Sequence, residues 1–210
     1  GLKFNHAEND FDDFIREILL PQKQSTLGPA IAVSDVNNDG LDDLFIGNAR
    51  GSSSAMFIQG EGGAFTRSNK SIWDHDKIYE DVAAVFFDAD GDGDPDLYVV
   101  SGGNESEASS PDYEDRLYIN NGLGSFGRDY QALPPVTISG GCAVPGDFDA
   151  DGDLDLFVGG RTVPGKYPFS PPSYLLFNEG GKFREPGAEW NDAVSGLGMV
   201  NDAISTDYDL

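Results

Sequence analysis

Three nine-residue segments of this chain carry oxygen-bearing side chains at alternate positions. They are 35–43, 88–96 and 147–155, and each has Asp or Asn at positions 1, 3 and 5, Gly at position 6 and Asp at position 9. Calcium takes six to eight oxygen ligands at about 2.3–2.6 Å, which alternate side chains supply when the chain wraps around an ion. Glycine permits the sharp turn that this wrapping needs. The segments therefore predict three Ca²⁺ loops of one design.

Each predicted loop uses the side chains at positions 1, 3, 5 and 9 and the backbone carbonyl of position 7. The expected ligands are Asp35, Asn37, Asp39, Leu41 and Asp43 in the first loop, Asp88, Asp90, Asp92, Asp94 and Asp96 in the second, and Asp147, Asp149, Asp151, Asp153 and Asp155 in the third. The chain has 37 acidic and 13 basic residues, and 14 of the acidic ones lie in these loops. Such crowding costs repulsion that a bound cation would remove, whereas a merely solubilising surface does not require it.

Two other divalent-cation designs fit these segments less well. An EF-hand loop needs a bidentate Glu at position 12 and flanking helices. Position 12 is Ile46, Val99 or Val158 here, and the flanking segments are rich in Val, Ile and Phe. Magnesium seldom takes an all-protein ligand cage. Three polar turns without a metal remain the alternative.

The composition limits the class of partner. A net charge of −24 disfavours nucleic acid and anionic membrane surfaces. No apolar run approaches the roughly 20 residues that span a bilayer. The single cysteine, Cys142, cannot form an internal disulfide and is expected to be a small buried residue. We expect neither nucleic-acid binding nor direct membrane insertion.

The loops recur inside a longer repeat. Their first residues are 53 and 59 positions apart, and a fourth segment begins at Asp207. The expected strands are 30–33, 44–46, 55–58 and a run from Phe65; 82–87, 97–100, 116–119 and a run from Phe126; and 142–144, 156–158, 174–177 and a run from Phe183. Four strands in about every 50–60 residues predict an all-β fold, a partial β-propeller of four-stranded antiparallel blades with three blades plus the first strand of a fourth.

The repeat boundaries divide the chain into five parts. We expect an N-terminal arm at 1–29, blades at 30–80, 81–139 and 140–199, and the truncated start of a fourth blade at 200–210. The arm holds apolar residues at helical spacing before Pro21, namely Phe11, Phe14, Ile15, Ile18 and Leu19. This spacing predicts a short amphipathic helix, or else an apolar arm packed on the blades.

The loop pattern D-x-[DN]-x-D-G-x-x-D between two strands resembles the FG-GAP/VCBS repeat of integrin α-subunit propellers and many bacterial secreted proteins. Residues 99–104, 116–122 and 158–165 resemble more narrowly the ASPIC/UnbV-type secreted proteins of Bacteroidetes. The resemblance covers roughly residues 30–210. It implies a seven- or eight-bladed propeller, a larger chain, and a location that is extracellular, at the cell surface or periplasmic. The family has no single activity and includes adhesion modules, glycan-binding proteins and polysaccharide lyases.

Residues suited to catalysis are sparse. His75 and Tyr79 lie in one polar connector and could act as base and acid on a uronic-acid sugar if they converged, with Arg116 or Arg161 holding its carboxylate. The alternative is a packed loop with a solvated His75. The sequence contains no nucleophile elbow and no phosphate-binding Gly loop. We therefore assign no catalytic residues.

The sequence favours a calcium-binding extracellular module that recognises a glycan or a protein through its blade-connecting loops. The alternatives are part of a polysaccharide lyase or hydrolase, or a structural spacer in a larger secreted protein. A propeller needs about four to eight blades to close. We therefore also expect a fragment cut within the fourth loop after Leu210, which self-associates as an open arc through its unpaired edges.

Overall fold

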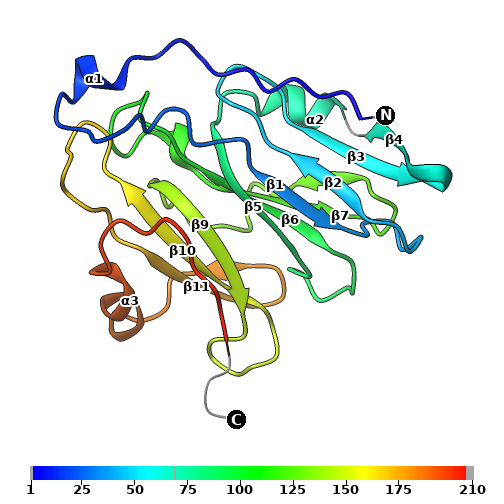
Figure 1. Cartoon of the computed structure of the whole chain (residues 1–210). Helices are drawn as coiled ribbons and strands as arrows, with labels where there is room; N and C mark the ends of the chain where they lie inside the picture. Colours follow the sequence, from blue (N-terminus) through cyan, green and yellow to red (C-terminus); the bar gives the residue numbers. More distant parts are fainter. Residues whose placement is uncertain (1, 69, 207–210) are drawn as a thin grey trace.

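The strands form three four-stranded antiparallel sheets, in each of which neighbours follow sequence order (Figure 1). The computed structural model describes residues 2–68 and 70–206. The sheets consist of β1 (Ile31–Ser34), β2 (Asp43–Ile46), β3 (Ala55–Gly60) and β4 (Ala64–Ser68); β5 (Asp81–Phe87), β6 (Asp96–Ser101), β7 (Arg116–Asn120) and β8 (Phe126–Arg128); and β9 (Ser139–Gly146), β10 (Asp155–Thr162), β11 (Tyr174–Asn178) and β12 (Phe183–Arg184). The predicted all-β class with three four-stranded blades is confirmed.

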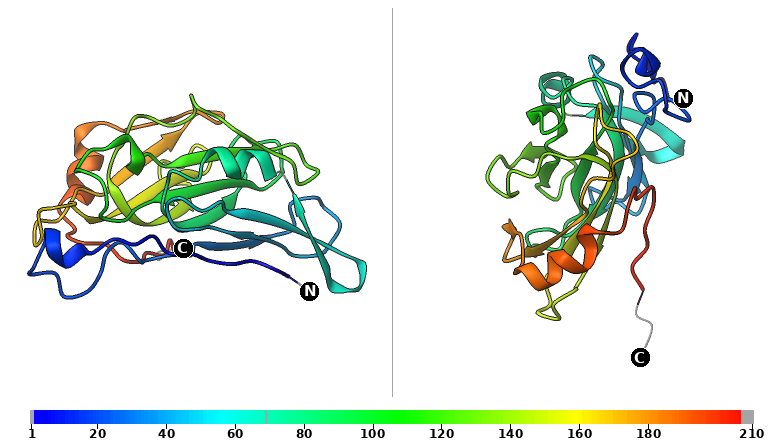
Figure 2. Two further views of the ribbon diagram at one scale, coloured as in Figure 1. Left: turned by 90° about the horizontal axis from the view of Figure 1, so that it is seen from above. Right: turned by 90° about the vertical axis from the view of Figure 1, so that its left-hand side faces the viewer.

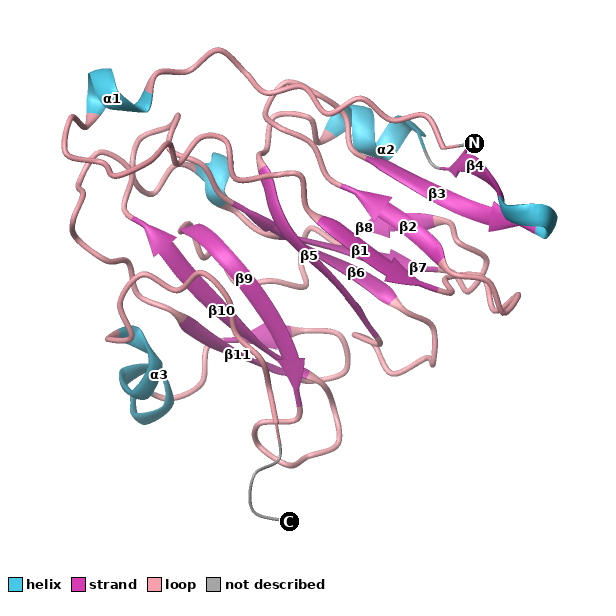
Figure 3. Ribbon diagram, in the orientation of Figure 1, coloured by secondary structure: helices cyan, strands magenta, loops and turns pink. Residues whose placement is uncertain are grey.

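Three short α-helices lie at the periphery of the sheets (Figure 3). They are α1 (Asp13–Arg16), α2 (Lys70–His75) and α3 (Ala188–Ser195). None of the helices in the described ranges is both long and apolar enough to cross a membrane.

Each sheet begins with a hairpin that an Asp-rich loop closes. The pairs at the mouths of these hairpins are Ser34 with Asp43, Phe87 with Asp96, and Gly146 with Asp155. The β-branched and aromatic residues on both sides of each loop favour extended backbone. The last residue of each loop is therefore also the first residue of the second strand, which holds the loop rigidly on the sheet.

The middle sheet is buried on both faces, because successive side chains of a strand point to opposite sides. On β6, Leu97 and Val99 pack in a cluster with residues of the first sheet, whereas Tyr98 and Val100 pack in a cluster with residues of the third. All four side chains are at most 1% exposed. Burial of a large apolar side chain contributes about 1.5–3 kcal/mol. The three sheets therefore pack on one another as neighbouring blades, as Figure 2 shows from two further directions.

A buried ionic network joins the first two blades. Arg116 is 2% exposed and donates from Nη2 to Asp81 Oδ1 at 2.6 Å and from Nη1 to the Tyr118 hydroxyl at 3.4 Å. The Tyr118 hydroxyl donates to Asp76 Oδ2 at 2.8 Å, and Arg128 pairs with the same carboxylate at 2.9 Å. Removing one partner from such a network leaves an uncompensated buried charge, so the network opposes separation of these blades.

The N-terminal arm has the short helix that was predicted, but polar side chains, and not the predicted apolar face, attach the arm to the blades. The helix α1 contains only four residues, and Ile15 and Ile18 are 83% and 82% exposed. The buried side chains are acidic instead: Asp13 Oδ1 and Glu17 Oε2 accept hydrogen bonds from Asn104 Nδ2 at 3.0 and 2.9 Å. The physical reason is that a buried amide must be hydrogen-bonded, and one helical turn is too short to present an apolar face.

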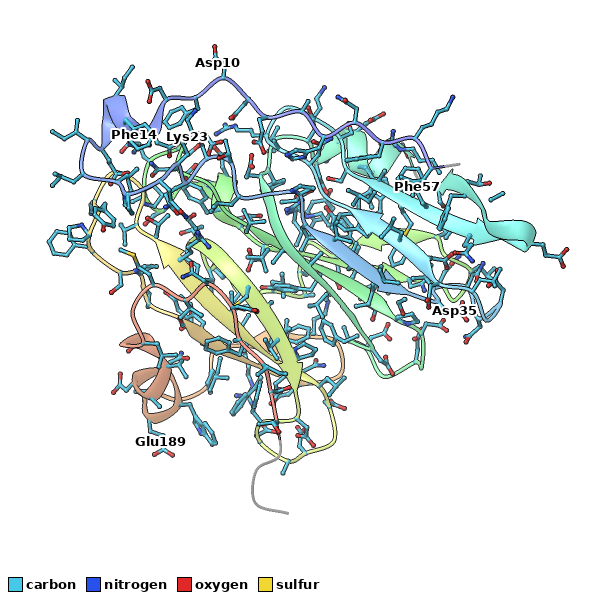
Figure 4. The ribbon with its side chains drawn as sticks, viewed as in Figure 1. Asp10, Phe14, Lys23, Asp35, Phe57 and Glu189 are labelled. Atoms are coloured by element: carbon cyan, nitrogen blue, oxygen red, sulfur yellow. The ribbon has the colours of Figure 1, made fainter. Side chains whose placement is uncertain are left out.

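The blades have two distinct ends, which we call the loop end and the arm end. Asp35 marks the loop end, and Phe14 and Lys23 lie on the arm at the opposite end (Figure 4). Beyond α3, Val200 N donates to Gly160 O at 2.8 Å beside the third sheet. The predicted start of a fourth loop, residues 207–210, lies outside the described residues.

Candidate metal centre

The first Asp-rich loop wraps around the carboxylate at its first position. Asp35 Oδ1 accepts from the backbone N–H of Asp39 at 3.1 Å, and Oδ2 accepts from Gly40 N at 2.7 Å. Asn38 and Gly40 have φ values of 59° and 82°, in the left-handed region that reverses the chain within the loop. Burial opposes ionisation of Asp35, but four backbone N–H groups outweigh it and lower its pKa. The loop therefore holds this carboxylate in its charged form.

The second and third loops repeat this geometry. Gly93 N donates to Asp88 Oδ2 at 3.0 Å, and Gly152 N donates to Asp147 Oδ2 at 3.2 Å. At position 6, where glycine was predicted, φ is 91° in Gly93 and 102° in Gly152. The position 5 carboxylates of all three loops accept the N–H of position 7 at 2.9 Å. Three segments far apart in sequence thus adopt one local structure.

The carboxylate at position 9 fastens each loop to the third strand of its own blade. Asp43, Asp96 and Asp155 are fully buried. In each case Oδ2 accepts the N–H of position 2 at 2.8–3.0 Å, and Oδ1 accepts a backbone N–H at the end of the third strand at 2.7–2.8 Å. Position 9 was predicted as a metal ligand only, and this second, structural role was missed.

The second and third loops bring three carboxylates each to metal-binding spacing. Ligand oxygens of Asp88, Asp90 and Asp96 lie within 4.8 Å of one another, and so do those of Asp147, Asp149 and Asp151. Two oxygens bound to one Ca²⁺ at about 2.4 Å are at most about 4.8 Å apart. Six of the predicted ligands therefore stand where a single cation in each loop could reach them.

The electrostatics of these clusters fit a divalent cation. Burial raises the pKa of Asp96 to about 6, and the charges of Asp90 and Asp92 add to the shift. Burial, and then the charges of Asp155 and Asp151, raise the pKa of Asp149. The buried Oδ1 atom of Asp149 has no hydrogen-bond partner in the described part of the chain. A cation would neutralise the repulsion and supply the missing partner.

The other predicted ligands are placed differently. Among the described residues the first loop forms no such group of three acidic side chains. It has the neutral Asn37 at position 3, whose Nδ2 donates to Asp39 Oδ2 at 3.1 Å. Asp92 stands outside the group of the second loop. At position 7, where the backbone carbonyl was the predicted ligand, the Asp153 side chain accepts the N–H of Gly180 at 3.1 Å in the hairpin of its own blade.

Two asparagines that sequence reasoning missed join the first and second loops to the next blade. Asn120 Nδ2, in the second blade, donates to Val36 O of the first loop at 2.8 Å. Asn178 Nδ2, in the third blade, donates to Ala89 O of the second loop at 2.8 Å and to Leu154 O of its own loop at 3.1 Å. Both are buried. The available signal was the Asn-x-Gly that ends the third strand at 120–122 and 178–180.

The structure separates the residues that were considered for catalysis. The His75 side chain is 71% exposed, and its Nδ1 lies 2.9 Å from Asp76 Oδ1. Tyr79 is buried, and the guanidinium carbon of Arg116 lies 4.4 Å from the centroid of the Tyr79 ring. Arg116 itself is committed to its buried pair with Asp81. These three residues therefore do not line one substrate site.

Four-stranded blades that carry an Asp-rich loop between their first two strands define a propeller-type repeat module. The family described as FG-GAP-like repeat matches residues 35–99 and 100–158, and the chain belongs to this family. No curated protein shows a significant match to the chain. The family match supports the general resemblance predicted from the loops; the narrower likeness to ASPIC/UnbV-type proteins or integrins stays a prediction.

Proposed function

We propose that this chain is an extracellular Ca²⁺-binding propeller module that recognises a glycan or protein ligand. The observation that carries the calcium assignment is the pair of carboxylate triplets at metal-binding spacing, in loops that share the hydrogen bond from the position 6 N–H to the first carboxylate. Calcium suits them better than magnesium, because their ligands are all oxygens of the protein. The first loop is proposed as a third site that uses Asn37 in place of a carboxylate.

The proposed location follows from the affinity expected for such loops. Extracellular calcium modules bind with Kd of about 10⁻⁴–10⁻³ M, which suits a compartment with about 1 mM free Ca²⁺. Occupancy would then add roughly 0.5–1.5 kcal/mol of stability per site. Three sites would be a substantial part of a marginal total stability.

Calcium removal tests the first half of this proposal. We expect the Tm to fall when EGTA is added, to recover with excess Ca²⁺, and to respond much less to Mg²⁺. Terbium luminescence, sensitised by nearby aromatic rings and displaced by Ca²⁺, would count the sites. An unchanged Tm together with no displaceable terbium would contradict the calcium assignment.

A cavity at the arm end of the blades supports the recognition half of the proposal. The segments that connect the strands of the second and third blades form an open cavity of about 340 Å³, a size common for ligand sites. It is lined by residues such as Ser109, Pro135, Thr162, Pro171 and Tyr174. Because we assign the loop end to the ions, we assign the arm end to the ligand.

A glycan array probed with the Ca²⁺-loaded protein and with the EGTA-treated protein tests recognition. We expect selective binding that is lost with EGTA, since the loops stabilise the blades whose far ends form the site. Product release from polysaccharides, followed as uronate-elimination absorbance, would instead support the lyase alternative. Absence of binding to any glycan or candidate protein would contradict the recognition function.

A further inference from the structure

Arg161 is a partly buried arginine without a carboxylate partner. Arg67 also lacks one, but it is exposed and donates to Ser54 O. Five of the seven arginines pair with a carboxylate, namely Arg16, Arg50, Arg116, Arg128 and Arg184. Arg161, near the end of β10, uses only Nε, which donates to Gln24 Oε1 at 3.1 Å. Within the described residues its two terminal guanidinium nitrogens have no partner. In a chain with 37 acidic residues, such an unpaired and partly buried cation calls for an explanation.

The N-terminal arm contacts one polar side chain in every blade, at or just after the C-terminal end of the second strand. Asn48 in the first blade accepts from Ala7 N, and its Nδ2 is also bonded. In the second blade Asn104 donates to two arm carboxylates. The residue contacted in the third blade is Arg161, whose charged group extends beyond the contact with Gln24.

Arg161 borders a small cavity between the arm, the third blade and the segment after α3. The cavity has a volume of about 180 Å³, below the roughly 300–1,000 Å³ of sites for drug-sized ligands. Its polar lining consists of Gln22, Gln24, Arg161, Thr162, Tyr167 and Asn201, and Pro21 and Met199 form the apolar part. Three amides and two hydroxyl groups offer both donors and acceptors around one guanidinium. This lining matches a small ligand with several hydroxyl groups and one negative charge.

We propose that this cavity is a subsite for the carboxylate of an acidic sugar, held by the guanidinium of Arg161. The amides and hydroxyls of the lining take the hydroxyl groups of the same sugar ring. This subsite deepens the proposed recognition function and rests on it, since it names uronate-containing glycans as the ligand class. A peptide carboxylate suits the cavity less well, because the lining beside Arg161 offers five neutral hydrogen-bonding side chains and only two apolar ones, Pro21 and Met199.

The net charge of −24 works against any anion, but local geometry outweighs it at this position. Exposed charges farther away than about 8 Å are largely screened at physiological salt, whereas a direct guanidinium–carboxylate contact is not. Glu17, which accepts the N–H of the lining residue Tyr167 at 2.6 Å, is already bonded to Asn104. Desolvation alone lowers the pKa of Arg161, with no carboxylate acting on it.

The direct test is a titration of the full chain with D-glucuronate, D-glucose and acetate in Ca²⁺, followed by the NMR signal of the Arg161 Nε–H group. We expect glucuronate to shift this signal and to bind at least about tenfold more tightly than glucose or acetate. Arg161→Gln should weaken glucuronate binding about tenfold, and Arg161→Lys should weaken it less. Arg184→Gln, at an exposed arginine of β12, is the matched control and should bind as the unaltered protein does.

Equal binding of glucose and glucuronate, equal binding of acetate, or no shift of the Arg161 signal would each overturn the subsite. These outcomes use the unaltered protein, so they hold even if Arg161→Gln fails to fold. Glycan-array binding that Arg161→Gln leaves unchanged would overturn the subsite while the recognition function stands. A glucuronate shift at Arg161 without binding to any array glycan or protein would support the subsite and contradict the recognition function.

Discussion

Individual carboxylates of one loop have different tasks, although the sequence presents them as equivalent. Asp90 is exposed and belongs to the triplet of the second loop, and desolvation together with the charges of Asp92 and Asp88 raises its pKa. Asp96 is fully buried and accepts two backbone N–H groups, from Ala89 and Asn120. A cation would relieve the repulsion in the first arrangement, whereas the second arrangement holds the fold without one.

Substitution by Asn separates these tasks. Asp90→Asn should weaken calcium binding but leave the Tm in EGTA unchanged or slightly raised, because it removes repulsion. Asp96→Asn leaves one of the two buried N–H groups facing an amide donor, so it should lower stability by about 1–3 kcal/mol even in EGTA. Thermal unfolding of both variants with Ca²⁺ and with EGTA measures this. Equal losses in EGTA would contradict the division of roles.

Glu80 is a buried carboxylate, and its protonation should change the free energy of unfolding of the whole chain. It is 2% exposed, its Oε2 accepts from Arg50 N at 2.7 Å, and its buried Oε1 has no partner among the described residues. Burial raises its pKa to about 8, and the charges of Glu105 and Glu8 add to this shift. The folded state therefore retains a proton that the unfolded chain loses above its ordinary pKa of 4.5.

The sign of the pH dependence follows from this raised pKa. The stabilising contribution of protonated Glu80 is complete below about pH 4.5 and is lost as the pH rises to about 8, by at most about 5 kcal/mol. Glu80→Gln should flatten the fall in unfolding free energy between these values and be the more stable protein at pH 8. Urea denaturation across this range, with Glu61→Gln as an exposed control, measures the slopes. Parallel slopes for Glu80→Gln and the unaltered chain would show that Glu80 is ionised in the folded state.

At the scale of elements, the first and second Asp-rich loops are each part of a blade interface. The end of the third strand bonds backward to the loop of the preceding blade, through Asn120 for the first loop and Asn178 for the second. Asn178 also accepts the N–H of Gly181. Gly181 lies in the hairpin between β11 and β12 and packs closely on Asp90 of the second loop. Calcium binding and blade packing are therefore expected to support each other.

Truncation of Asn178 tests this coupling. Asn178→Ala removes the bonds to Ala89 O and Leu154 O from a buried site, so we expect a loss of about 1–3 kcal/mol and weaker calcium binding by the second loop. Asn191→Ala is the matched control: it is in the same blade and loses its bonds to Leu175 N and Glu185, but not one to a neighbouring blade. Calcium affinity that is equal in both variants would refute the coupling.

At the scale of the whole molecule, the two outer blades each present an apolar sheet face. On β1, Ile31 and Val33 are 59% and 56% exposed, although the corresponding residues of β5, Ala84 and Phe86, pack on the preceding blade. The outward face of the third blade forms an apolar cavity of about 310 Å³. Its lining includes Val144, Phe157, Leu175 and Ile204. Large apolar faces of this kind favour association.

We therefore expect two copies to associate by packing the β1 face of one against the third-blade face of the other. The weight-average mass from light scattering should rise with protein concentration. Val33→Glu should abolish this rise, whereas Thr66→Glu, at an exposed position of β4, should not. A constant monomer mass at high concentration, with a well-folded spectrum, would exclude association and leave the blade assignment intact.

The sequence by itself determined the blades and the loops, because both depend on short-range patterns. Alternation of side chains over a few residues specifies a strand, and Asp at positions 1, 3 and 5 before Gly93 or Gly152 specifies a turn around oxygen atoms. Repetition of these patterns at intervals of 53 and 59 residues then required a repeat architecture.

Only the tertiary structure decided which polar side chains are anchors and which are free. Asp13 and Asn104 are 91 residues apart, and Gln24 and Arg161 are 137 apart, yet each pair is hydrogen-bonded. No local periodicity encodes such contacts, because they depend on how the arm crosses the assembled blades. The same packing buried Arg116 against Asp81 and left Arg161 beside a cavity, although both were equal candidates in sequence. The physical reason is that a buried polar group needs a hydrogen-bond partner, and the fold supplies a carboxylate to Arg116 but not to Arg161.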